Sequence, residues 1–327
     1  MVPQGSVLVM LVTLVDRLPT PPAAPGRPRG HPVMYSDRLF LKALVIMIVR
    51  RLAGVHELLS VLAEPTAEMQ TLRGLLMEQG RLPCRRTFER RLAALPATLP
   101  AQIACLGGHL VALIDPWLAY ARAAAIDSTV LRAKGGVWHK KDREAGVVPH
   151  SSIDTEASWT KSGWHGWVYG WKLHLVCAVG AAWIPLAALL TTASEADNTL
   201  APALIAPRPP ALRFLLGDQH YRDPALEELC AQRDCVLVTP RRGRYPHHDA
   251  GKEVRRILHK TRSVTIENFN EQFKGMFEGH QAVPTKGLVA TQRFALGAVF
   301  VYQLSLLHRF EHGADLRVGL KAFLKAA

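Results

Sequence analysis

Apolar residues recur at helical spacing through the first third of the chain. A serine–aspartate pair at 36–37 can cap a helix whose apolar positions continue to Val49. The same three- and four-residue spacing predicts two further helical segments, over 66–79 and 83–95. The pattern therefore predicts a small all-helical N-terminal domain, which we bound at residues 35–116.

Near residue 123 the pattern changes to that of β-strands. Three runs rich in apolar and β-branched residues, at 123–133, 166–180 and 183–193, predict an antiparallel meander. The elements predicted after them are a helix over 198–206, a strand over 213–218, a helix over 224–233, a strand over 235–240, a basic loop over 241–264, and helices over 265–278 and 288–310. This order predicts an α/β fold over 117–327, a ribonuclease-H-like mixed sheet flanked by helices.

The first residues carry a short apolar run followed by a proline-rich segment. The run at 6–15 is too short to span a bilayer, and no basic residue precedes it as in a signal peptide. Six prolines lie within 19–32, which is typical of an unstructured linker. We therefore interpret residues 1–34 as a disordered extension with little structural role.

Charge bears on the partner more than on the fold. The formal net charge of the 327 residues is +13, which favours a polyanionic partner, nucleic acid first and anionic membrane second. The five cysteines are odd in number and scattered, so they do not form a disulfide framework, and a reducing cytoplasm fits them best.

Basic residues gather in three places that could contact DNA. The helix over 83–95 has arginines in its first turns, which is typical of a helix-turn-helix reader, although a solvated basic face has the same pattern. Residues 240–274 contain nine Lys or Arg against four acidic residues. Over 134–172 lysines alternate with tryptophans, which can stack on bases or pack a hairpin onto the sheet. The DNA contacts predicted from these stretches are Arg85, Arg86, Arg90, Lys172, Arg241 and Arg242.

Two aspartates lie in predicted strands. Asp127 lies within the apolar run at 123–133, and a carboxylate there is costly unless it is paired or bound to a cation. Asp218 follows the apolar residues of the strand at 213–218, at its carboxyl end. If these two strands are neighbours, the two carboxylates converge. Asp197 and Asp223 each precede a predicted helix, and we interpret both as helix caps.

A third carboxylate comes from the helix over 265–278. Glu267 falls about 100° from Ile266, at the margin of the apolar face, while its rival Glu271 falls about 140° away. Lys274 lies two turns further along nearly the same edge. Three carboxylates suit two Mg²⁺ ions, with Mn²⁺ able to substitute, because hard divalent cations prefer oxygen ligands. We assign the bridging position between the two ions to Asp127.

Four stretches in order resemble the DDE transposases of bacterial insertion sequences. They are AIDSTVLRA at 125–133, YGWKLHLVCAVG at 169–180, FLLGDQHYRD at 214–223 and IENFNEQFK at 266–274. The resemblance implies that Asp127, Asp218 and Glu267 are the metal ligands. It implies hydrolysis at transposon ends and attack of the freed 3′-OH on target DNA, by a dimer or larger complex that holds two ends together.

The residues around Glu267 match the family only in part. The resemblance implies a Tyr seven residues before the Glu, an Arg four before it and a Lys seven after it. Lys274 matches, whereas Lys260 and Ser263 occupy the two earlier positions and Arg262 stands one residue away. We therefore add Lys274, Arg262 and Lys260 to the predicted DNA contacts.

Three alternatives to a transposase remain from the sequence. A nuclease of the same fold, such as a junction resolvase, would share the carboxylates without joining ends. A DNA-binding protein derived from a transposase would not catalyse, and the intact acidic triad argues against it. A secreted or membrane-bound protein would need the run at 6–15 to be a targeting signal. We expect a cytoplasmic protein whose partner is double-stranded DNA, with no membrane partner.

Overall fold

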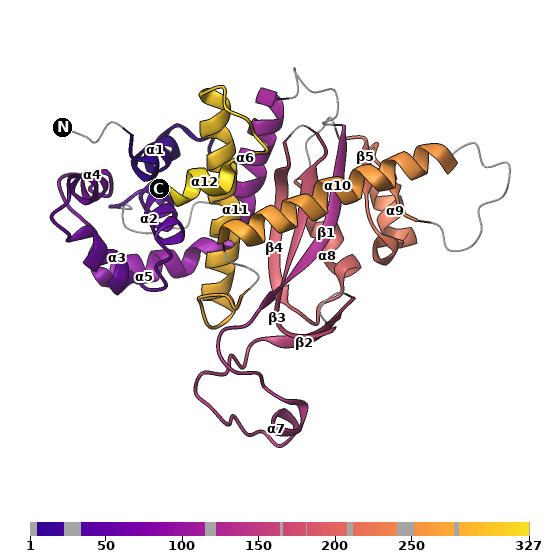
Figure 1. Cartoon of the computed structure of the whole chain (residues 1–327), viewed down its shortest axis with the longest axis horizontal. Coiled ribbons are helices and arrows are strands. Elements are labelled where there is room, and N and C mark those ends of the chain that lie inside the picture. Colours follow the sequence, from indigo (N-terminus) through magenta and orange to yellow (C-terminus); the bar gives the residue numbers. More distant parts are fainter. Residues whose placement is uncertain are drawn as a thin grey trace.

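The fold consists of a helical N-terminal region packed beside a mixed sheet (Figure 1). The computed structural model describes residues 5–22, 34–114, 122–163, 166–180, 182–207, 212–240, 252–277 and 281–326. The N-terminal helices are α1 (Val7–Leu14), α2 (Asp37–Val49), α3 (Val55–Leu62), α4 (Ala67–Leu75), α5 (Arg85–Ala94) and α6 (Leu99–Ile114). The sheet region contains β1 (Ala123–Arg132), α7 (Lys140–Glu144), β2 (Ser158–Ser162), β3 (Gly166–Ala178), β4 (Ile184–Thr192), α8 (Asp197–Ile205), β5 (Phe214–Leu216), α9 (Pro224–Ala231) and β6 (Val236–Val238), followed by α10 (Lys252–Phe277), α11 (Leu288–Glu311) and α12 (Leu320–Lys325).

The cap predicted for the helix after residue 36 is confirmed. The Ser36 hydroxyl accepts a hydrogen bond from the backbone N–H of Leu39 at 3.3 Å, which satisfies a donor that the first turn of α2 leaves open. Ten of the thirteen residues of α2 are buried, so this helix is apolar on nearly all sides and lies inside the helical region.

Helix α1 contradicts the prediction that residues 1–34 form a disordered extension. Leu8, Leu11 and Val12 are fully buried. The helix packs against α2, α4 and the C-terminal α11. The apolar run at its centre is therefore part of the core, because it covers helices that would otherwise expose apolar surface to water.

The sheet contains the antiparallel meander expected from the sequence, with β2 as an additional strand. Its path is β2-β3-β1-β5-β6, and β4 pairs with β3. β3 pairs antiparallel with both β1 and β4, which forms the predicted antiparallel meander, while β1, β5 and β6 run parallel to one another. The predicted fold class, a mixed sheet flanked by helices and preceded by a helical region, is thus confirmed.

Helices α8 and α10 cover opposite faces of the sheet. Successive side chains of a strand point to opposite faces, and directly paired residues point to the same one. Asp127 of β1 pairs with Leu175 of β3, and the next residue, Ser128, pairs with His174. A side chain of α10 bonds to Asp127, whereas one from α8 reaches His174. In Figure 1, α10 crosses in front of the strands.

A single buried cluster joins the helical region to the sheet. It contains Phe88 of α5, Leu175 of β3, Phe269 of α10 and Phe300 of α11. Helix α11 connects the two parts of this cluster, since it packs on α2 and α6 of the helical region and on β4 of the sheet. The predicted division between 35–116 and 117–327 falls at residues outside the described ranges, so it stays a proposal.

Helix α10 is longer than predicted. It begins at Lys252, so the prediction of a basic loop over 241–264 is wrong for residues 252–264. Residues 241–251 lie outside the described residues. Lys, Arg and Glu are good helix formers, and the charged stretch continues the helix through pairs such as Glu253–Arg256, whose Nε–Oε2 distance is 3.0 Å.

The helices were also compared with the dimensions of a bilayer. Among the described residues, no single helix is long and apolar enough to span one. The bent pair Arg85–Ala97 and Leu99–Ile114 meets the length and composition criteria when its two helices are taken together.

Candidate catalytic site

The two predicted aspartates stand at the same level, Asp127 on β1 and Asp218 just after the end of the neighbouring β5. The last parallel pair between β1 and β5 is Ala125–Leu216, and Asp127 and Asp218 each lie two residues further on. Neighbouring strands are about 4.8 Å apart, so equal register brings the two carboxylates together at this edge of the sheet. The expectation that the aspartates converge if their strands are neighbours is therefore met in the structure.

Asp127 is held in a largely buried and electrostatically crowded place. Its carboxylate accepts the backbone N–H of Ser128 at 2.8 Å and Nη1 of Arg262 at 3.2 Å. Burial raises the pKa of Asp127 to about 6, the Arg262 cation opposes this rise, and the charges of Asp218 and Asp197 add to it. The ionised form is thus destabilised, and a bound divalent cation would remove that penalty.

Asp218 begins the short 3₁₀ turn Gln219–Tyr221. Its Oδ1 accepts the backbone N–H of His220 at 2.8 Å, and its Oδ2 lies 2.9 Å from Nδ1 of the same residue. The side chain of Asp218 remains 30% exposed. Asp218 is therefore oriented by the turn after β5 while its carboxylate stays accessible from outside, as a metal ligand requires.

We expect Asp127→Asn to raise the thermal midpoint of the metal-free protein at pH 8 by about 5 °C. The folded-state pKa of about 6 lies above the ordinary value of 3.8. The favourable contribution of Asp127 is therefore fully present below about pH 4 and is lost as the pH rises through 6. The loss corresponds to about 3 kcal/mol. Thermal unfolding in EDTA between pH 4 and 8 checks this, and a difference between variant and wild type that does not change with pH would contradict it.

Asp197 makes contacts near the two aspartates' strands that the sequence analysis did not predict. The cap of α8 is Ala196, so the interpretation of Asp197 as a cap is wrong. Its Oδ1 lies 3.2 Å from Nζ of Lys172 and 3.5 Å from Nδ1 of His174. The signal was available in β3, where two basic side chains alternate with apolar ones, because buried cations need a carboxylate partner. Asp223, in contrast, caps α9 as predicted by accepting the N–H of Ala225 at 2.9 Å.

Lys172 does not have the exposure that its predicted DNA contact needs. Its side chain is only 10% exposed. Its Nζ donates to the backbone oxygen of Glu195 at 2.7 Å and pairs with Asp197. The ammonium group is thus engaged beneath the surface, and Lys172 links β3 to the start of α8 instead of meeting a phosphate.

With this geometry in place, comparison with known families identifies the chain. The family model described as the transposase DDE domain matches residues 121–304. The chain belongs to this family. The match begins just before β1 and ends within α11, so it includes both aspartates at the sheet edge and the whole of α10.

Two solved structures are similar to this transposase-family chain. One is described as a cryo-EM structure of the piggyBac transposase synaptic complex with hairpin DNA, at 10% identity and a TM-score of 0.40, covering 98% of this chain and 76% of that one. The other is a crystal structure of a pre-cleavage Mos1 transpososome, at 12% identity and a TM-score of 0.22, covering 86% and 80%. Comparison with the curated proteins found no match.

Glu267 of this transposase domain lies apart from the two aspartates. It is exposed on α10, five residues after the Arg262 that bonds to Asp127. Five residues correspond to about 140° around a helix, so Glu267 does not point where Arg262 points. Within the described part of the chain, no three Asp, Glu, His or Cys side chains lie close enough to hold a metal ion. The structure therefore brings two predicted ligands together and leaves the third at a distance.

The basic residues of α10 differ in their surroundings. Arg262 is mostly buried, with 14% of its side chain exposed, and it pairs with Asp127. Lys260 is exposed. Lys274 is half-buried, and burial lowers its pKa, against the opposing charge of Glu271. Of the predicted DNA contacts on this helix, Lys260 has the greatest freedom to meet a phosphate.

The remaining predicted DNA contacts lie elsewhere. Arg85, Arg86 and Arg90 are exposed on α5, and Arg85 pairs with Glu89 at 2.7 Å. Their exposure suits both a DNA contact and a solvated face, so the contact stays a prediction. Arg241 and Arg242 lie outside the described residues.

Proposed function

We propose that this transposase-family protein cleaves phosphodiester bonds at the ends of an insertion sequence and transfers the freed 3′-OH to target DNA. The observation that carries the proposal is the level placement of Asp127 on β1 and of Asp218 two residues after the neighbouring β5. Both lie within the part of the chain that matches the transposase DDE domain. Its DNA partners would be the terminal inverted repeats and the target duplex.

Asp127 and Asp218 are the residues that would hold Mg²⁺, with Glu267 proposed as a third ligand and Mn²⁺ as a substitute. Mg²⁺ binds through one or two carboxylates and substrate oxygens, which fits a largely buried carboxylate, Asp127, beside the more accessible Asp218. Two such ions supply stabilisation of the attacking and leaving oxygens in an in-line displacement at phosphorus. Asp127, in the position nearest the middle of the sheet, is proposed as the bridging ligand.

The protein's own residues set up this site. The backbone N–H of Ser128 and the guanidinium of Arg262 orient the carboxylate of Asp127, and His220 orients Asp218. Arg262 also lowers the pKa of Asp127, which favours the charged form that binds a cation. Lys260 would bind a backbone phosphate beside the site. A homodimer in a cytoplasmic synaptic complex follows from the need to process two ends together.

A strand-transfer assay tests the proposal. A labelled terminal-repeat duplex with a recessed 3′-OH is incubated with a supercoiled target plasmid and Mg²⁺. We expect the label to appear covalently in the plasmid, and to be absent with EDTA or with a 3′-deoxy end. Cleavage of intact ends without any joining would instead indicate a nuclease of the same fold. The absence of both cleaved and joined products would contradict a catalytic role.

A further inference from the structure

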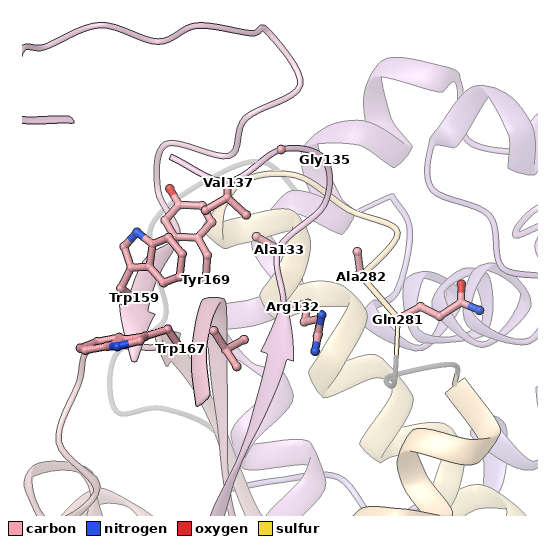
Figure 2. A pocket seen from close by; sticks show the side chains of 11 residues that line it. Arg132, Ala133, Gly135, Val137, Trp159, Trp167, Tyr169, Gln281 and Ala282 are labelled. Atoms are coloured by element: carbon pink, nitrogen blue, oxygen red, sulfur yellow. The ribbon is translucent and has the colours of Figure 1, made fainter. Parts of the chain in front are cut away.

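An open aromatic pocket lies at the carboxyl end of β1 (Figure 2). Its volume is about 350 Å³. The walls come from the last residues of β1, the loop after it, strands β2 and β3, and the segment at 281–282 that follows α10. This segment is fixed to β1, because the N–H of Val283 donates to the backbone oxygen of Arg132 at 2.9 Å.

Three aromatic rings form one side of this pocket. Trp159, Trp167 and Tyr169 lie together there, while Gln281 lies on the opposite side (Figure 2). The Trp167 side chain is 67% exposed, although burying a tryptophan is among the most favourable contributions that one side chain can make. An exposed tryptophan at the mouth of a pocket therefore has an apolar face available for a planar ligand.

The rings behind Trp167 are held in fixed orientations. The indole N–H of Trp159 donates to the backbone oxygen of Trp138 at 2.9 Å. The rings of Trp159 and Tyr169 are 5.4 Å apart, and the Tyr169 hydroxyl donates to the backbone oxygen of Asp154 at 2.6 Å. This side of the pocket is thus preorganised, which reduces the entropy cost of binding.

Cations flank the aromatic side. Arg132 lines the pocket and is exposed, and in the described ranges its guanidinium forms no ion pair. Lys161 of β2 is also exposed and pairs in register with Trp167 of β3. Aromatic faces beside unneutralised cations are the combination that binds single-stranded nucleic acid, through base stacking and phosphate attraction.

The pocket lies within reach of DNA bound at the two aspartates. Arg132 is five residues beyond Asp127 on β1, and a strand rises about 3.3 Å per residue, which gives about 17 Å. That span equals about five base steps of 3.4 Å. We propose that this pocket binds one unpaired base of the DNA substrate, about five nucleotides from the phosphate at Asp127. The proposal rests on the proposed function for the identity of its ligand.

A binding experiment without metal tests the pocket separately from catalysis. Two duplexes of one sequence are compared in EDTA, one fully paired and one with a single unpaired 2-aminopurine, whose fluorescence reports stacking. For the wild-type protein we expect tighter binding of the unpaired duplex and quenching on binding. Trp167→Ala should lose about ten-fold in affinity for the unpaired duplex, the range expected for stacking of one base, and less than two-fold for the paired one.

Matched variants control for side effects. Trp167→Phe keeps an aromatic face and should retain most of the affinity, and Arg132→Gln should weaken binding of both duplexes. Val318→Ala removes an equally exposed apolar side chain, 70% exposed, near the C-terminus and should change neither. If Trp167→Ala loses the same affinity for both duplexes, or loses none, the proposal is overturned. If free dAMP competes for the pocket at the same concentration at which the unpaired duplex binds, the assignment of the pocket to a base within DNA is overturned.

The result of the test of the pocket can be distinguished from the result of the test of the proposed function. Binding of the unpaired duplex that depends on Trp167, in a protein that neither cleaves nor joins, would support the pocket and contradict the transposase chemistry. Strand transfer by a Trp167→Ala variant with unchanged DNA affinity would support the chemistry and contradict the pocket.

Discussion

Asp127→Asn and Asp218→Asn are each expected to lower Mg²⁺-dependent cleavage of terminal-repeat DNA by about a hundred- to a thousand-fold, the range for loss of one group that stabilises transition-state charge. The two carboxylates stand level, one on β1 and the other just after β5, and each supplies charge that an amide does not. Both variants should fold, because Asn is nearly isosteric with Asp. Initial rates on a labelled duplex, with excess enzyme, measure the effect.

Asp223 offers a matched control for this experiment. It lies five residues after Asp218 and caps α9, with its carboxylate on the N–H of Ala225. Asn is as good a helix cap as Asp, so Asp223→Asn should keep cleavage within about two-fold of wild type. Cleavage by Asp127→Asn at the wild-type rate, or an equal loss in Asp223→Asn, would contradict the assignment of the site.

Glu267→Gln is expected to lose about a hundred-fold in cleavage, while Glu271→Gln loses less than about three-fold. Both residues are exposed on α10 one turn apart, so the two substitutions disturb the helix equally. They differ in that only Glu267 is proposed as a ligand. Because the structure does not bring Glu267 into one cluster with the aspartates, its proposed role requires a movement of α10 or of its side chain when DNA binds.

The opposite result would reassign the third ligand. If both glutamine variants cleave like wild type, Glu267 is not part of the site. Asp197 is then the next carboxylate to test, since its charge raises the pKa of Asp127, although its side chain faces Lys172 and His174 in this structure. Asp197→Asn measured in the same assay distinguishes the two possibilities, with its folding checked separately because it leaves Lys172 and His174 without their partner.

The convergence of Asp127 and Asp218 was predictable because it depends on local patterns. Asp127 stands within an apolar, strand-like run and Asp218 at the end of another, so their convergence was predicted on the condition that the two strands are neighbours, which they are in the sheet. The cap at Ser36 and the cap at Asp223 are local in the same sense, since each side chain bonds to a backbone N–H two or three residues away.

The features that were mispredicted depend on contacts distant in sequence. Nothing local distinguishes the apolar α1 from part of an extension with little structural role, and its burial is decided by distant helices that include α11. Asp197 resembles a helix cap until β3 places Lys172 and His174 beside it. The direction of Glu267 depends on how α10 is rotated against the sheet, which the helical period alone does not determine.

Magnesium binding measured by calorimetry tests the central claim most directly, because it needs no substrate sequence. Mg²⁺ is titrated into the wild-type protein, Asp127→Asn, Asp218→Asn and Asp223→Asn at pH 8, where Asp127 is ionised. We predict saturable binding by the wild type and Asp223→Asn, and a loss of about ten-fold or more in affinity for each of the other two. Equal Mg²⁺ affinity in all four proteins would contradict a metal site at Asp127 and Asp218.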